Sequence, residues 1–191
     1  EHRPDTVSLT EAVTVAARKG ILPQALPNYL FQVFYTLAAM QVYGFQHNDL
    51  HTHNILVDNS PDVESITYKV GSDKYVVPVR YGKALLFDWD NGYCNLCGDN
   101  PALARRCARY GLCNVLNAKY DLFKLMTLLT VILGELDAHD GMEGFEQFRA
   151  DILGNADVHQ ELSGHICMRS TRYRGRCRPI QPHEPEGVMT V

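Results

Sequence analysis

The chain is 191 residues long, 46% of its residues are hydrophobic, and its formal net charge is -4 at pH 7. This composition is typical of one globular domain, or one large lobe of a bigger protein, with enough apolar residues to form a core. The negative charge argues against non-specific nucleic-acid binding, which needs an excess of Lys and Arg. We find neither a signal-peptide pattern nor an apolar run of membrane-spanning length, so we expect an intracellular, cytoplasmic protein with no membrane partner.

Two helices are predicted in the first quarter of the chain. The first covers residues 6–19 and ends before Gly20, a residue that often terminates helices. The second covers residues 28–43, where apolar residues recur at helical spacing up to Gly44. This second helix leads directly into a polar loop at residues 47–54.

Short strands are predicted after the polar loop. Residues 55–57 are Ile-Leu-Val, a short apolar strand. Residues 65–70 and 74–79 flank a Gly-Ser-Asp turn and predict a hairpin. Residues 84–87 form a further strand, which presents Asp88 at its end.

The second half of the chain is organised around helices. Residues 91–117 predict a long Gly- and Cys-containing loop with a brief helix near 101–110. Apolar residues between 118 and 137 cover most of a helix circumference, so this helix should be buried. A helix over 143–153 precedes an Arg-, Gly- and Pro-rich tail. We therefore divide the chain into a lobe, residues 1–137, and a C-terminal helix and tail, residues 138–191.

The most informative motif is the run from His47 to Asn54, His-Asn-Asp-Leu-His-Thr-His-Asn, with Asp88 further on. Asp49 is a candidate general base, and Asn54 and Asp88 carry the hard oxygen ligands that Mg²⁺ prefers. Transfer of a γ-phosphoryl group depends mainly on alignment and charge neutralisation, so a few fixed oxygens suffice. His51 could donate to a phosphate oxygen.

These residues match the protein-kinase pattern H-R-D-L-x-x-x-N, with Asn48 in place of Arg, and Asp88 matches the magnesium-binding Asp. Residues 6–137 thus resemble the C-terminal lobe of the protein-kinase-like superfamily. The resemblance implies an α+β, mainly α-helical fold in which short β-hairpins carry the catalytic loop, 47–54, and the metal loop, 87–90. The motif is most similar to serine/threonine kinase-like proteins of large double-stranded DNA viruses, such as iridoviruses, which implies host cytoplasm or a virion as the location.

The resemblance implies ATP- and magnesium-dependent phosphoryl transfer to a protein Ser or Thr hydroxyl. It also implies two structural residues: His47 would tie the loop to the segment after Asp88, and Asp121 would bond the backbone of the catalytic loop. A carboxylate favoured by the helix dipole is the alternative explanation of Asp121.

The sequence departs from the kinase pattern before the polar loop. No Gly-rich ATP-covering loop and no strand lysine precede His47, so the N-terminal lobe is absent from this sequence and would be supplied in cis or in trans. Asp-Trp-Asp at 88–90 replaces the usual Asp-Phe-Gly. Two other functions stay open: a small-molecule phosphotransferase, which His51 permits, and a pseudokinase-like structural or interaction component, for example of a virion.

Cysteines and arginines suggest further partners. Zinc could be bound by Cys94, Cys97, Cys107 and Cys113, although the second pair is more widely spaced than in common zinc ribbons, and ordinary reduced thiols are the alternative. Five arginines between residues 169 and 178 could recognise an acidic or phosphorylated protein, or form a solvated tail.

Overall fold

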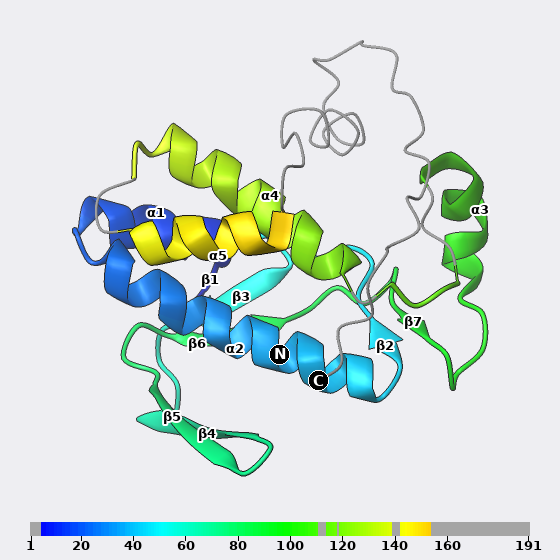
Figure 1. The fold of residues 1–191 in the computed structure, drawn as a ribbon, viewed down its shortest axis with the longest axis horizontal. Coiled ribbons are helices and arrows are strands. Elements are labelled where there is room, and N and C mark those ends of the chain that lie inside the picture. Colours follow the sequence, from blue (N-terminus) through cyan, green and yellow to red (C-terminus); the bar gives the residue numbers. More distant parts are fainter. Residues whose placement is uncertain (1–4, 111–113, 118, 139–141, 154–191) are drawn as a thin grey trace.

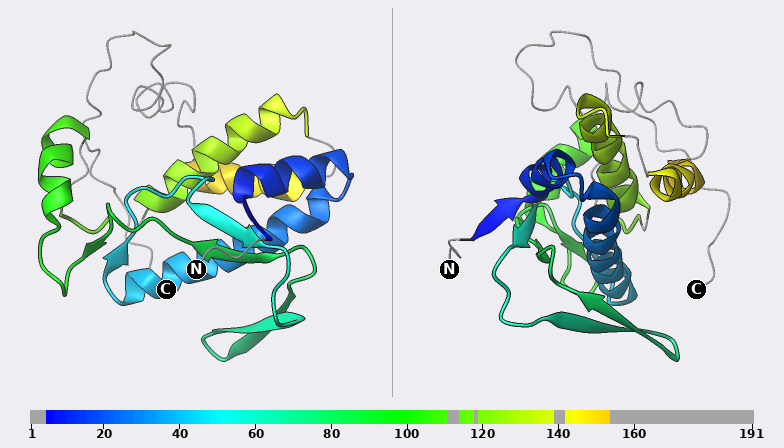
Figure 2. Two further views of the ribbon diagram at one scale, coloured as in Figure 1. Left: turned by 180° about the vertical axis from the view of Figure 1, so that it is seen from behind. Right: turned by 90° about the vertical axis from the view of Figure 1, so that its left-hand side faces the viewer.

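Helices and short antiparallel strands build an α+β arrangement (Figure 1). The computed structural model describes residues 5–110, 114–117, 119–138 and 142–153. These contain five helices and seven strands: β1 (Thr6–Ser8), α1 (Leu9–Arg18), α2 (Leu22–Val42), β2 (Phe45–Gln46), β3 (Ile55–Asp58), β4 (Ser65–Val70), β5 (Asp73–Pro78), β6 (Lys83–Leu86), β7 (Tyr93–Cys94), α3 (Pro101–Tyr110), α4 (Tyr120–Glu135) and α5 (Glu143–Leu153). In Figure 1 and in the left view of Figure 2, α3 lies at the opposite end of the molecule from α1.

The predicted first helix is shorter than expected because its first residues form a strand. Ser8 caps α1: its Oγ accepts a hydrogen bond from the Glu11 amide, while the Glu11 carboxylate accepts one from the Ser8 amide. Val7, directly before the cap, pairs with Val57 in the sheet. That pairing joins distant parts of the chain, so local periodicity could not reveal it.

Helix α2 begins earlier than predicted. Pro23 and Pro27 indicated a loop, but Pro23 lies in the first turn of the helix, where its missing amide hydrogen is no loss. Pro27 is accommodated inside the helix. The long helix packs against β6 through the buried amide of Gln32, which accepts from the Ala84 amide at 3.0 Å and donates to the Gly82 carbonyl at 3.1 Å.

A three-stranded antiparallel sheet, in the order β1-β3-β6, carries the polar loop at one end. Ile55 pairs with Leu86, so the residues just before β3 and just after β6 lie side by side. The predicted strands at 55–57 and 84–87 are present with shifts of one residue at most. The hairpin of β4 and β5 is also confirmed, and it contacts α2, where the Tyr35 hydroxyl donates to the Lys69 carbonyl at 3.0 Å.

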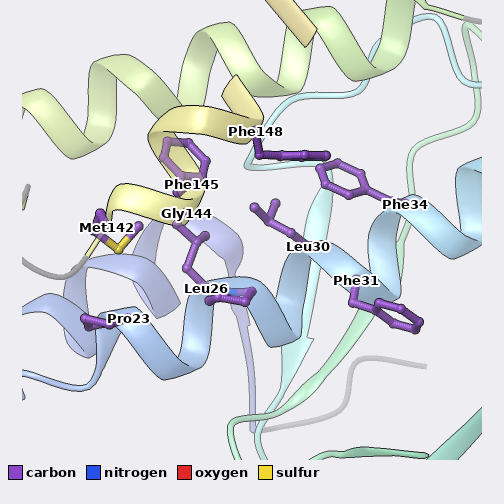
Figure 3. A pocket seen from close by; sticks show the side chains of 10 residues that line it. Pro23, Leu26, Leu30, Phe31, Phe34, Met142, Gly144, Phe145 and Phe148 are labelled. Carbon is purple, nitrogen blue, oxygen red and sulfur yellow. The ribbon is translucent and has the colours of Figure 1, made fainter. Parts of the chain in front are cut away.

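Helices α1, α2, α4 and α5 share one hydrophobic core. The predicted buried helix is confirmed as α4, whose Leu125, Met126 and Leu129 are fully buried. Helix α5 packs on α2, and its Phe145 belongs to the same core. Between these two helices lies an open apolar cavity of about 430 Å³, shown in Figure 3. It is lined by Pro23, Leu26, Pro27, Leu30, Phe31, Phe34, Met142, Gly144, Phe145 and Phe148.

The predicted fold is corrected by this architecture. We expected a mainly helical, protein-kinase-like C-terminal lobe with short hairpins, and that prediction is wrong. The described residues form an α+β fold in which five helices are combined with three separate small antiparallel sheets. Strands β1, β2 and β7 have only two or three residues each, and they exist because distant segments meet rather than because of a local pattern.

Among the described residues, none of the helices combines the length and the apolar character that crossing a bilayer requires.

Candidate active site

The polar loop is held by a hydrogen bond to the core helix α4. The backbone amide of His47 donates a hydrogen bond of 2.8 Å to the Asp121 carboxylate, in the first turn of α4. The contact predicted for Asp121 is therefore present. Both residues are buried, and burial raises the pKa of Asp121 above its usual value, against the opposing effect of the hydrogen bond from His47.

The His47 ring joins the loop to the segment around Asp88. Its Nδ1 accepts from the Asp49 amide at 3.3 Å, so Nε2 carries the proton and donates to the Phe87 carbonyl at 2.9 Å. The ring also lies 4.6 Å from the Trp89 ring, measured between centroids. His47 was predicted to contact the segment after Asp88, and the structure shows that it contacts both the residue before and the residue after.

Two residues of the site have a left-handed backbone. Asn48 has a φ of 65° and Asp88 a φ of 63°, values that are uncommon for residues other than glycine. The side chain of Asn48 is buried, and its Oδ1 accepts a hydrogen bond from the Gln46 side chain through Nε2. Asn and Asp tolerate this conformation best, and such local strain is concentrated at functional sites.

Asp49 is held by two side chains that the sequence did not identify. Lys124 Nζ lies 2.6 Å from Asp49 Oδ1, and Asn91 Nδ2 donates to Asp49 Oδ2 at 2.9 Å. The Lys124 and Asp49 side chains are only 11% and 15% exposed, so solvent screens this ion pair weakly. One signal could have identified Lys124: it is a charged residue in a helix whose apolar pattern predicts burial all round.

The amide of Asn91 offers an acceptor beside Asp49. Asn91 is 4% exposed, and its Oδ1 atom is buried without a hydrogen-bond partner. A buried acceptor without a protein partner is costly, so such atoms commonly meet water, an ion or a ligand. The Oδ1 atom of Asn91 therefore adds a further oxygen acceptor next to the Asp49 carboxylate.

Asn54 and Asp88 lie at the same end of the sheet. Asn54 precedes β3 and is buried, and its Nδ2 donates to the Asp49 carbonyl at 3.0 Å, which leaves its Oδ1 as an oxygen donor for a cation. The Asn54 carbonyl accepts from the Phe87 amide at 3.2 Å. Asp88 follows immediately, and its side chain is exposed. Carboxylate and amide oxygens of this kind suit Mg²⁺.

The next histidine of the polar loop, His51, contacts His53. Its Nδ1 accepts from the His53 amide at 3.2 Å, and the rings of His51 and His53 are 6.0 Å apart. Next to it, the Thr52 carbonyl accepts from the Leu9 amide at 3.1 Å, which fixes the middle of the loop to the start of α1. The role of His51 as a phosphate donor stays a prediction.

The predicted zinc ligands are brought together only in part. The Sγ atoms of Cys94 and Cys97 are 2.7 Å apart, and the hydrogen bond between them lowers the pKa of the Cys94 thiol and raises that of Cys97. Cys107 belongs to a disulfide, and Cys113 lies outside the described residues. Within the described part of the chain, His, Cys, Asp and Glu do not gather in groups of three or more that could hold a metal ion.

No protein-family model, curated protein or solved structure matches this chain. Without such a match the kinase-like lobe has no support as a fold. The functional assignment therefore rests on the site itself: a clamped carboxylate, a buried amide and an exposed aspartate gathered at one end of a sheet.

Proposed function

We propose that this site takes part in magnesium-dependent phosphoryl transfer from ATP to the hydroxyl of a protein Ser or Thr. One observation carries the proposal: both carboxylate oxygens of Asp49 are held, by Lys124 at 2.6 Å and by Asn91 at 2.9 Å, within the loop that also presents Asn54. Because both of its oxygens are held, the Asp49 carboxylate is preorganised for one role in the site.

Asp49 is suited to orient an attacking hydroxyl. Phosphoryl transfer passes through a loose transition state, so alignment of the nucleophile matters more than strong basicity. The ammonium of Lys124 compensates the charge of Asp49 and restricts the rotation of its carboxylate. Asn91 restricts the second oxygen, so the carboxylate has one preferred orientation toward a substrate.

Asn54 and Asp88 are the residues that would hold the metal ion. The bond from Asn54 Nδ2 to the Asp49 carbonyl fixes the amide plane, and the exposed Asp88 carboxylate lies on the adjoining strand end. When bound, Mg²⁺ would neutralise charge on the ATP phosphates and keep several of its waters, so two protein oxygens are enough.

Support from the core gives this arrangement the rigidity that catalysis requires. The amide of His47 is fixed by Asp121, and the ring of His47 is fixed by the carbonyl of Phe87. The base-carrying loop and the metal-carrying segment are thus joined through one side chain. A preorganised site loses little free energy to rearrangement during the reaction.

The first test measures metal–nucleotide binding by the full chain. Mn²⁺ replaces Mg²⁺ as a paramagnetic probe, and its binding in the presence of ATP is followed by electron paramagnetic resonance. We expect Asp88→Asn to weaken binding at least about tenfold, because a carboxylate ligand is lost. Asp73→Asn is the matched control, since Asp73 is an exposed carboxylate on the β4–β5 hairpin, and it should bind as the wild type does.

The second test measures transfer from γ-labelled ATP to a library of Ser- and Thr-containing peptides and, separately, to small alcohols. Label in peptides that falls about 10²- to 10⁴-fold in Asp49→Asn supports the proposal. Label in small alcohols alone would replace the proposed acceptor by a small molecule. Metal–nucleotide binding without any transfer would contradict catalysis and favour an interaction component.

A further inference from the structure

A four-residue turn at Cys94–Cys97 brings two thiols together outside the candidate active site. The Cys97 amide donates to the Cys94 carbonyl at 3.1 Å, which closes the turn, and Cys94 forms an isolated bridge with Gly98. Gly98 has a φ of 84°, a conformation that glycine adopts without strain. The backbone thus holds the two cysteines on one side of a tight reversal.

The two sulfur atoms are almost at bonding distance. They are 2.7 Å apart, whereas a disulfide bond is about 2.05 Å long, so closing the bond needs a movement of only about 0.7 Å. The two cysteines differ in access: Cys97 is exposed and Cys94 is buried. The Cys97 thiol is therefore open to reagents in solution, and the Cys94 thiol lies next to it.

We propose that Cys94 and Cys97 form a redox site that is modified reversibly by small-molecule disulfides. In the first step the exposed Cys97 thiol loses its proton and its sulfur attacks a sulfur of the reagent disulfide; a mixed disulfide forms, and the leaving reagent thiolate takes up that proton. In the second step the Cys94 thiolate attacks the Cys97 sulfur; the Cys94–Cys97 bond forms and the second reagent thiolate leaves. Two protein thiols are oxidised, and one reagent disulfide is reduced to two thiols.

The position of this turn gives the modification a structural consequence. Cys94 pairs with Phe45 across β7 and β2, and the Asn95 amide donates to the Gly44 carbonyl at 3.1 Å. The Asn95 side chain covers Gly44 so closely that a Cβ there would lie 1.9 Å from its Oδ1. Strand β2 runs directly into the polar loop, so a disulfide would fix the support of that loop.

The test uses the full chain and needs no variant. Trypsin should release residues 84–105 as one peptide, because no Lys or Arg lies between Lys83 and Arg105, and its only cysteines are Cys94 and Cys97. The protein is equilibrated with defined ratios of reduced and oxidised glutathione, blocked with an alkylating reagent and digested. We expect this peptide to change from the doubly alkylated form to an unalkylated disulfide form that is two hydrogens lighter than the free dithiol. The ratio of the two forms should change tenfold per about 30 mV in the reduction potential of the glutathione mixture.

Two results would overturn the proposal. The first is a peptide that stays doubly alkylated even in excess oxidised glutathione. The second is a stoichiometric zinc ion, found by native mass spectrometry of chelator-free protein, that protects both thiols from alkylation and from oxidation. Cys97→Ser serves as a supporting variant: Cys94 should then take up at most one glutathione and form no internal bond.

Discussion

Lys124 and Asp49 form an ion pair of 2.6 Å although they are 75 positions apart in the sequence. The pair joins the polar loop to the core helix α4, and neither side chain is more than 15% exposed. Two opposite charges at this distance and under weak screening interact strongly. Removing one of them should therefore change the free energy of unfolding measurably.

Replacing Lys124 should expose this coupling. Lys124→Met leaves Asp49 without its cation in a largely buried position, and we expect the free energy of unfolding to fall by about 3 kcal/mol in urea denaturation. The control is Lys119→Met, since Lys119 is exposed just before the same helix, and it should change stability by less than about 0.5 kcal/mol. Asp49→Asn combined with Lys124→Met should cost less than the sum of the single changes; strict additivity would argue against the coupling.

Asp121 should make stability depend on pH in a defined direction. Its pKa is raised in the folded protein by burial, so between the usual value of 3.8 and the raised value the folded state binds more protons than the unfolded state. Stability should therefore fall as pH rises through this window. Asp121→Asn removes that slope. The free energy of unfolding of the variant should therefore rise relative to that of the wild type as pH increases. Urea unfolding at several pH values tests this, and parallel curves for the two proteins would contradict it.

Gln32 should be essential to the contact between α2 and β6. Gln32→Met keeps the volume but leaves the Ala84 amide and the Gly82 carbonyl without their side-chain partner. We expect a loss of about 2–3 kcal/mol in the free energy of unfolding. Gln24→Met, at an exposed position of the same helix, provides the comparison and should be nearly neutral. A similar small effect at both positions would show that these hydrogen bonds contribute little.

Trp89 should report nucleotide binding. It is the single tryptophan of the chain, it follows Asp88 directly, and its ring lies 4.6 Å from that of His47. Binding of Mg²⁺–ATP at Asp88 should alter its solvent contact and shift its fluorescence. Asp88→Asn should abolish the shift, and Asp73→Asn should preserve it. An undiminished shift in Asp88→Asn would place the nucleotide elsewhere.

Elements with a strong local pattern were predictable from the sequence. Helix α4 was evident from its near-continuous apolar residues, and the β4–β5 hairpin from its Gly-Ser-Asp turn. Strand β1 was not, because only its pairing with β3 makes it a strand. The start of α2 was missed because Pro23 and Pro27 resemble loop residues, although the first turn of a helix tolerates proline.

The candidate site was predictable where its residues are neighbours in the sequence. Asp49 and Asn54 belong to one short motif, and the contact between His47 and Asp121 was expected from the resemblance. Lys124 was missed because its partner is 75 positions away, and a sequence pattern carries no information about which distant side chains meet. The same resemblance gave a wrong fold, since a short motif constrains a loop more than it constrains the architecture around it.

The bond between the His47 amide and Asp121 also has a kinetic meaning. His47 belongs to a segment without helix or strand hydrogen bonds, where amide hydrogens usually exchange quickly with solvent. Its acceptor, however, is a carboxylate on the buried helix α4, so the hydrogen is released only when that helix separates from the loop. The exchange rate of this one amide should therefore follow the separation of the loop from α4, and a residue in an irregular loop becomes a reporter of that contact.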